Sequence, residues 1–243
     1  MIRKAAPFVA AVLVLGGTAA GSTVASSSAT AAGNAQTIKF SKSDLFVEIN
    51  DTDGDAGLQL NLDGEPWSTL ELVDPSGRVL MDVDNGSELK SYGLTGLTFE
   101  SAEPPFAEQP LSEFTARFPE GVYRFSGVTV DGRNIVGQDR LTHVFPVGPV
   151  VTAPTQGAVV PSSGLVVTWQ PVTKPTGVKI VHYEVIVTNL GSGKHLSMEL
   201  PPSATSAGIP REFLASGTEY AVEVLARETS GNQTITEVAF ETG

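Results

Sequence analysis

From residue 44 onward, the chain alternates apolar and polar residues in short runs. A large apolar residue occupies every second position in residues 45–49, 58–62 and 79–83. Alternation with this period is typical of β-strands that bury one face. Turn sequences separate the runs, and they include Asp74-Pro75-Ser76-Gly77, Asn85-Gly86 and Asp131-Gly132. The pattern predicts an all-β protein made of short strands and tight turns.

One segment departs from the strand pattern. Leu111, Phe114 and Phe118 recur at helical spacing, and a proline and a glycine follow within three residues. These residues predict a single short helix near 110–118.

Proline spacing divides the chain into two parts. Residues 146–154 hold three prolines and one glycine, a composition that stiffens the backbone and removes hydrogen-bond donors. Strand and turn signals occur on both sides of this segment. We therefore predict an N-terminal β-sandwich at 38–146, a linker at 147–153 and a second β-sandwich at 154–243.

The first residues have the features of a secretory signal peptide. Two basic residues precede an apolar run at 8–15, and small residues form a cleavage signal near 29–31. This predicts a signal peptide at 1–31 and a disordered segment at 32–37. The apolar run is too short for a membrane anchor, and no later segment is long enough to span a membrane. Without cysteine, lipid attachment at an N-terminal cysteine is excluded, so the predicted location is secreted or extracytoplasmic.

Composition narrows the possible partners. The net charge is −12 and becomes −14 when Arg3 and Lys4 are removed with the signal peptide. A surface this acidic disfavours nucleic acid and anionic membranes as partners. Because the exported chain has no cysteine for disulfides, its composition favours a bacterial exported protein.

The second predicted sandwich resembles a fibronectin type III domain. The resemblance rests on LVVTW at 165–169, Tyr183 in HYEVIV, and LASGTEY at 214–220. In this family the last motif forms a tyrosine corner, in which a phenol hydroxyl bonds to an upstream backbone group. The adhesive Arg-Gly-Asp tripeptide is absent from the sequence. The resemblance implies a binding or spacer module.

The first predicted sandwich carries a looser resemblance. INDTDGDAGLQ, DGEPW and FPEGVY resemble segments of uncharacterised bacterial exported domains with immunoglobulin-like or fibronectin-like sandwiches. No activity is attached to that group, so the resemblance implies no site residues. Together the two halves are predicted to form tandem immunoglobulin-like/fibronectin type III β-sandwiches after the signal peptide.

A group of aspartates offers a candidate calcium site. Asp51, Asp53 and Asp55 match the first three ligand positions of an EF-hand loop, but Ala56 and Leu62 replace the required glycine and glutamate. An EF-hand is therefore excluded. Two interpretations remain: a looser calcium site made by these three carboxylates, or an acidic turn between two strands. No other cofactor is predicted.

The sequence offers few other candidate residues for ligand binding or catalysis. Trp67 lies beside a turn and could stack on a sugar, although tryptophan is more often buried in a core. His143, His182 and His195 are far apart and match no catalytic motif. Four carboxylates could include an acid/base pair for glycoside hydrolysis: Glu100, Glu103, Glu108 and Glu113.

We therefore predict a secreted, non-enzymatic binding or structural module that acts through protein or cell-surface recognition. Its partner would be a protein or a polysaccharide at the cell surface. The alternative is a calcium-assisted carbohydrate-binding accessory module that uses Asp51, Asp53, Asp55 and Trp67. A hydrolase would require a cleft that holds two carboxylates about 5 to 10 Å apart.

Overall fold

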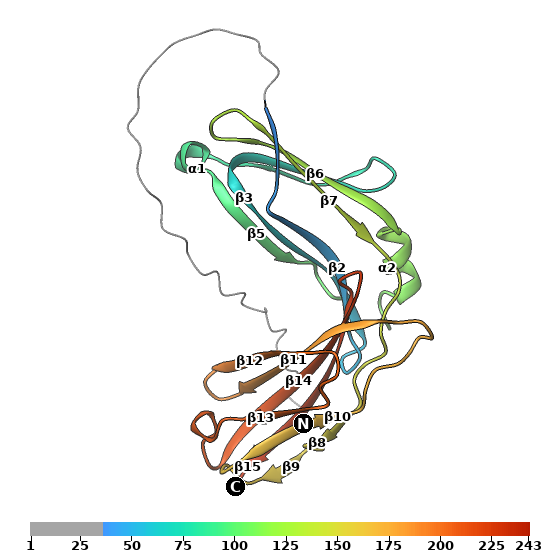
Figure 1. Ribbon diagram of the computed structural model, residues 1–243, viewed down its shortest axis with the longest axis vertical. Helices are drawn as coiled ribbons and strands as arrows, with labels where there is room; N and C mark the ends of the chain where they lie inside the picture. Colours follow the sequence, from blue (N-terminus) through green and yellow to red (C-terminus); the bar gives the residue numbers. More distant parts are fainter. Residues whose placement is uncertain (1–35) are drawn as a thin grey trace.

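The computed structural model describes residues 36–243, which form two β-rich lobes along the long axis of the molecule (Figure 1). The predicted signal peptide at 1–31 lies outside the described residues. So does most of the predicted disordered segment, of which Gln36 and Thr37 are described. No helix within residues 36–243 has the length and apolar character needed to cross a membrane.

The N-terminal lobe contains seven strands and two short helices. Its elements are β1 (Thr37–Lys39), β2 (Lys42–Asn50), β3 (Asp55–Val73), β4 (Val79–Asp84), α1 (Ser87–Tyr92), β5 (Leu94–Glu100), α2 (Leu111–Arg117), β6 (Gly121–Thr129) and β7 (Asn134–Leu141). Helix α2 lies within the range predicted from helical spacing, and it buries Phe114. Helix α1 was not predicted, because it buries no residue and so has no apolar periodicity.

The long strand β3 organises this lobe by pairing with four others. Its first half pairs with β2 and β5, and its second half pairs with β4 and β6. The register shifts between Asp63 and Trp67 mark the change of partners. At this bend Gly64 packs so closely against Phe40 and Ile135 that a Cβ would lie 2.9 and 3.0 Å from their side chains. A bent strand of this kind forms the corner between the two layers of a sandwich.

The C-terminal lobe contains two separate sheets. Its elements are β8 (Val151–Ala153), β9 (Ala158–Val160), β10 (Leu165–Trp169), β11 (Ile180–Asn189), β12 (His195–Leu200), β13 (Ser206–Ile209), the 3₁₀ helix η1 (Arg211–Phe213), β14 (Thr218–Glu228) and β15 (Gln233–Thr242). Strands β13, β10 and β8 form one sheet, and β9, β15, β14, β11 and β12 lie in the other. Strand β8 lies wholly within the segment predicted as linker, 147–153, because Val151 and Ala153 pair with Trp169 and Thr168 of β10.

The tyrosine corner inferred from LASGTEY is present in the C-terminal lobe. The Tyr220 hydroxyl donates to the Phe213 carbonyl at 3.1 Å and accepts from the Ala215 amide at 2.8 Å. The N-terminal lobe has a simpler counterpart, in which the Tyr123 hydroxyl donates to the Pro119 carbonyl at 3.0 Å. Both tyrosines are fully buried. The all-β fold with two sandwiches predicted from the sequence is therefore confirmed.

A joint between the lobes makes the larger sheet continuous. Strand β15 pairs in parallel with β2 over three residues, which begin with Gln233 opposite Glu48. Next to this pairing, the fully buried Asn232 side chain accepts from the Val47 amide at 2.8 Å. It also donates to the carbonyls of Thr142 and Val144 at 2.9 and 3.1 Å. One residue thus connects both lobes and the chain between them.

Candidate functional site

The acidic turn, residues 51–54, is built around an asparagine. The amides of Thr52 and Asp53 donate to the Asn50 side-chain oxygen at 3.0 and 3.1 Å. The Gly54 amide donates to the Asn50 carbonyl at 2.9 Å, and Gly54 has a φ of 70°. A side-chain carbonyl that bonds to amides two and three residues ahead is an Asx turn. Asn50 and Gly54, rather than the aspartates, define this turn.

The same turn occurs in the C-terminal lobe without acidic residues. Between β11 and β12, the amides of Gly191 and Ser192 donate to the Asn189 side-chain oxygen at 3.1 and 2.9 Å. The Gly193 amide donates to the Asn189 carbonyl at 2.8 Å, and Gly193 also has a φ of 70°. The geometry of the acidic turn therefore requires no metal ion.

The three aspartates have different surroundings. The Asp51 carboxylate lies beside Gly148 of the chain between the lobes. Asp53 is exposed, and its carboxylate accepts from the Asn50 side-chain amide at 3.3 Å. Asp55 is partly buried, and one of its oxygens has no hydrogen-bond partner. Within residues 36–243, the acidic side chains that converge closely enough for a shared ion are in a different group. As a set of three, the predicted calcium ligands do not assemble.

Trp67 does not occupy the position required for sugar binding. Its side chain is fully buried in the N-terminal core, at the bend of β3. A sugar stacks on an aromatic ring only where a ring face meets solvent. The prediction of Trp67 as a ligand-binding residue is therefore corrected to a core role, which was the alternative interpretation.

Three glutamates converge at the joint between the lobes. Glu48 comes from β2, Glu100 ends β5, and Glu103 lies in the loop that follows; one oxygen from each lies within 4.8 Å of the others. The Glu103 carboxylate covers Gly57, the residue paired with Glu48, where any side chain would collide with it. Sequence reasoning named Glu100 and Glu103 but missed Glu48, because no local pattern connects β2 with β5.

Burial and like charge shift the protonation of this group. Burial, together with the Glu100 charge, raises the pKa of Glu48 to about 7, although the Gln233 amide donates to Glu48 and opposes the shift. Burial and the charges of Glu100 and Glu48 raise the pKa of Glu103 to about 8. On β14, burial and the Glu237 charge raise the pKa of Glu223 to about 7. These carboxyl groups can hold protons near neutral pH.

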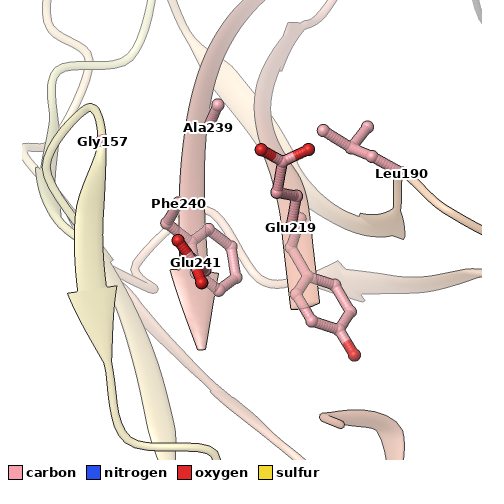
Figure 2. A pocket seen from close by; sticks show the side chains of 7 residues that line it. Gly157, Leu190, Glu219, Ala239, Phe240 and Glu241 are labelled. Carbon is pink, nitrogen blue, oxygen red and sulfur yellow. The ribbon is translucent and has the colours of Figure 1, made fainter. Parts of the chain in front are cut away.

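A cavity lies elsewhere in the molecule. It measures about 470 Å³ and is formed by β14, β15, the segment before β9 and the end of β11 (Figure 2). Glu219 and Glu241 line it, beside Leu190. The glutamates predicted as possible acid/base residues are not part of its lining. Glu108 and Glu113 are exposed, and Glu113 lies on α2.

The fold and the acidic joint define a class: an all-β protein of two sandwiches that share one sheet. Residues 152–242 match the family model of the fibronectin type III domain. The C-terminal sandwich is therefore a domain of this family, as predicted. The match does not extend to the N-terminal sandwich, whose resemblance to exported bacterial domains stays a prediction. No curated protein matches the chain.

Solved structures that the comparison matches to this chain include fibronectin type III domains of human and chicken proteins. The fn3 domain of the human collagen alpha-1(XX) chain is 22% identical, and the match covers 40% of this chain and 88% of that chain, with a TM-score of 0.31. The two-domain fibronectin type III segment of chicken tenascin is 13% identical, with coverage of 82% and 97% and a TM-score of 0.31. The FN1–FN3 domains of chicken CNTN1 are 12% identical, with coverage of 86% and 66% and a TM-score of 0.31.

Proposed function

We propose that this protein is a secreted, non-enzymatic binding or structural module that recognises a protein or polysaccharide at a cell surface. The fibronectin type III domain supports a binding or structural role. The basic residues and apolar run of the predicted signal peptide support secretion. A net charge of −12 disfavours nucleic acid and anionic membranes as partners.

The main structural support for this proposal is the joint between the lobes, which fixes how the two sandwiches are oriented. Besides the β2–β15 pairing, the Thr234 hydroxyl donates to the Pro146 carbonyl at 2.7 Å, and the Glu237 amide donates to the Thr52 hydroxyl at 2.8 Å. These bonds give the two sandwiches a defined orientation. While the joint is closed, this frame holds the loops of both sandwiches at fixed positions, which suits a spacer or a recognition module.

Co-sedimentation with cell envelopes tests this function. The purified full chain is mixed with envelopes of the producing organism, which are untreated, protease-treated or glycosidase-treated. Sedimentation that is lost after protease treatment supports a protein partner, and loss after glycosidase treatment supports a polysaccharide. Recovery of the chain only in the supernatant, at the level of an unrelated acidic protein of similar size, would contradict surface recognition.

The calcium-assisted carbohydrate module stays a prediction without a supporting observation. Trp67 is buried, and Asp51, Asp53 and Asp55 do not form a group close enough to share an ion. We therefore do not extend the proposal to calcium or to these residues.

A further inference from the structure

The continuous sheet has one face that crosses from one lobe to the other. Residues directly opposite in paired strands project on the same side of a sheet. Glu48 of β2 lies opposite Gln233 of β15, which lies opposite Arg227 of β14. Two and four residues further along β15, on the same side of the sheet, Ile235 pairs with Leu225 and Glu237 pairs with Glu223. We call this surface the junction face; its residues include Glu48, Glu184, Glu223, Arg227, Gln233, Ile235, Leu225 and Glu237.

Two apolar residues lie at the centre of the junction face and are hidden from water. Leu225 is 4% exposed and Ile235 is 8% exposed, although neither belongs to the core of the C-terminal sandwich. Acidic side chains surround them on the neighbouring positions of β2, β11, β14 and β15. An ionised carboxylate next to buried apolar surface loses hydration, so its neutral form is favoured.

The charged groups that act on Glu48, Glu103 and Glu223, or that flank them on the paired strands, are nearly all acidic. They are Glu48 on β2, Asp53 in the acidic turn, Asp55 on β3, Glu100 at the end of β5, Glu103 in the following loop, His182 and Glu184 on β11, Glu223 and Arg227 on β14, and Glu237 on β15. The Arg227 guanidinium lies over the Phe46 ring, 4.3 Å from its centroid. Among residues 36–243, no salt bridge includes any of these carboxylates.

The strand pairing at the edge of this face is short. Only three residues of β2 pair with β15, and the contact places Gln233 against Glu48. When the lobes are closed, Glu48 of β2 lies near Glu184 of β11 and Glu223 of β14, and Glu103 adds its charge to Glu48 from the same lobe. We propose that the junction is a proton-controlled joint, closed while Glu48, Glu103 and Glu223 carry protons and loosened when they are ionised. This inference does not depend on the proposed function.

The direction of the pH effect follows from the shifted carboxyl groups. Their pKa values in the closed form are about 7 for Glu48 and Glu223 and about 8 for Glu103, above the ordinary value of 4.5. A group with a raised pKa contributes full stability below its ordinary pKa and loses it as pH rises through the raised value. The joint is therefore firmest below the ordinary carboxyl pKa and loosens as pH rises through about 7, where Glu48 and Glu223 ionise.

Distance measurements between the lobes test this joint. The chain has no cysteine, so the substitutions Thr95→Cys and Ser192→Cys place one spin label on each lobe at exposed sites. Pulsed electron paramagnetic resonance of the full chain is recorded at about pH 5, 7 and 9. We expect one narrow distance distribution at the lowest pH and a broader one, with longer distances, at the highest. A distribution that does not change with pH overturns the proposal.

Matched variants identify the groups responsible. Glu48→Gln combined with Glu103→Gln, and separately Glu223→Gln, mimic the protonated forms and should keep the distribution narrow at high pH. Glu219→Gln removes an exposed carboxylate from the same strand as Glu223 and should leave the pH response unchanged. Circular dichroism verifies that each variant is folded.

Two further outcomes would also overturn the proposal. One is a pH response that persists at full size in the glutamine variants, because other groups would then control the joint. The other is a response to millimolar calcium with none to pH, because the junction face would then respond to a metal ion instead of protons.

Discussion

The two sandwiches enclose their buried aromatic residues between two layers of strands in different ways. In the C-terminal one, two separate sheets enclose Trp169, Tyr183 and Tyr220. In the N-terminal one, a single strand, β3, bends and pairs in both layers, and Trp67 lies at the bend. The first arrangement is carried by family motifs that are visible in the sequence. The N-terminal arrangement depends on a register shift in β3, and no sequence motif predicts that shift.

Because of this difference, we expect the same local feature to contribute different amounts of stability in the two lobes. Each lobe has a buried tryptophan, a buried tyrosine that bonds to upstream backbone, and an asparagine-centred hairpin turn. The surroundings of each feature decide how much stability it contributes. Four predictions test this comparison, from the largest expected effect to the smallest.

Trp67→Ala should cause the largest loss, because Trp67 fills the corner where β3 changes partners. Removing a buried tryptophan side chain costs about 3–5 kcal/mol of unfolding free energy. Urea unfolding, followed by circular dichroism, measures the loss. Trp67→Phe retains an aromatic ring and should cost clearly less. A loss below about 1 kcal/mol for Trp67→Ala would contradict the central role of the bend.

Asn232→Ala tests the connection between the sandwiches. The substitution leaves the Val47 amide and the carbonyls of Thr142 and Val144 without their partner. A buried polar group left unsatisfied costs about 1–3 kcal/mol, and we expect a loss of about 2–3 kcal/mol overall. Small-angle scattering should show a larger radius of gyration. An unchanged radius with unchanged stability would show that the joint does not depend on Asn232.

Removing the two tyrosine hydroxyls compares the corners directly. Tyr220→Phe removes the bonds to the Ala215 amide, the Phe213 carbonyl and the Asn189 side-chain amide, whereas Tyr123→Phe affects only the Pro119 carbonyl. We expect losses of about 1–2 kcal/mol for Tyr220→Phe and about 0.5–1 kcal/mol for Tyr123→Phe, measured by thermal unfolding. The reverse order would show that the N-terminal corner is the stronger one.

The smallest effect is expected in the acidic turn. Asp51→Asn combined with Asp53→Asn should change stability by less than about 0.5 kcal/mol, since both side chains are exposed and Asn50 makes the turn. Asn50→Ala and Asn189→Ala should each cost more, by similar amounts, because the two turns share one geometry. Melting with calcium and with chelator completes the comparison. A calcium-dependent rise that the Asp51/Asp53 variant loses would restore these aspartates as ligands.

Local patterns predicted much of the fold. Period-two alternation marked strands, as in residues 45–49, and helical spacing marked α2. Helix α1 was missed because its residues are all at least partly exposed, so it has no apolar face. The position of Trp67 was ambiguous, since a tryptophan beside a turn can be buried or exposed. Its burial depends on the bend of β3 and on packing from strands distant in sequence.

The candidate site was harder to predict from the sequence than the fold. The aspartates of the acidic turn are close in sequence, yet their three carboxylates do not come close enough together to share an ion. Glu48, Glu100 and Glu103 are spread over two strands and a loop, yet they converge. Sequence proximity therefore suggested a site at the three aspartates, which do not form one. The three glutamates are brought together by strand pairing, which sequence proximity does not reveal.

The sequence by itself determined the strands, the turns, the family of the C-terminal sandwich and the acidic charge of the chain. These properties follow from side-chain periodicity and backbone preferences that act over a few residues. Only the tertiary structure decided that β2 pairs with β15, across 185 positions between Glu48 and Gln233. That pairing brings the carboxylates of both sandwiches onto one face and removes them from water, and their burial raises their pKa values.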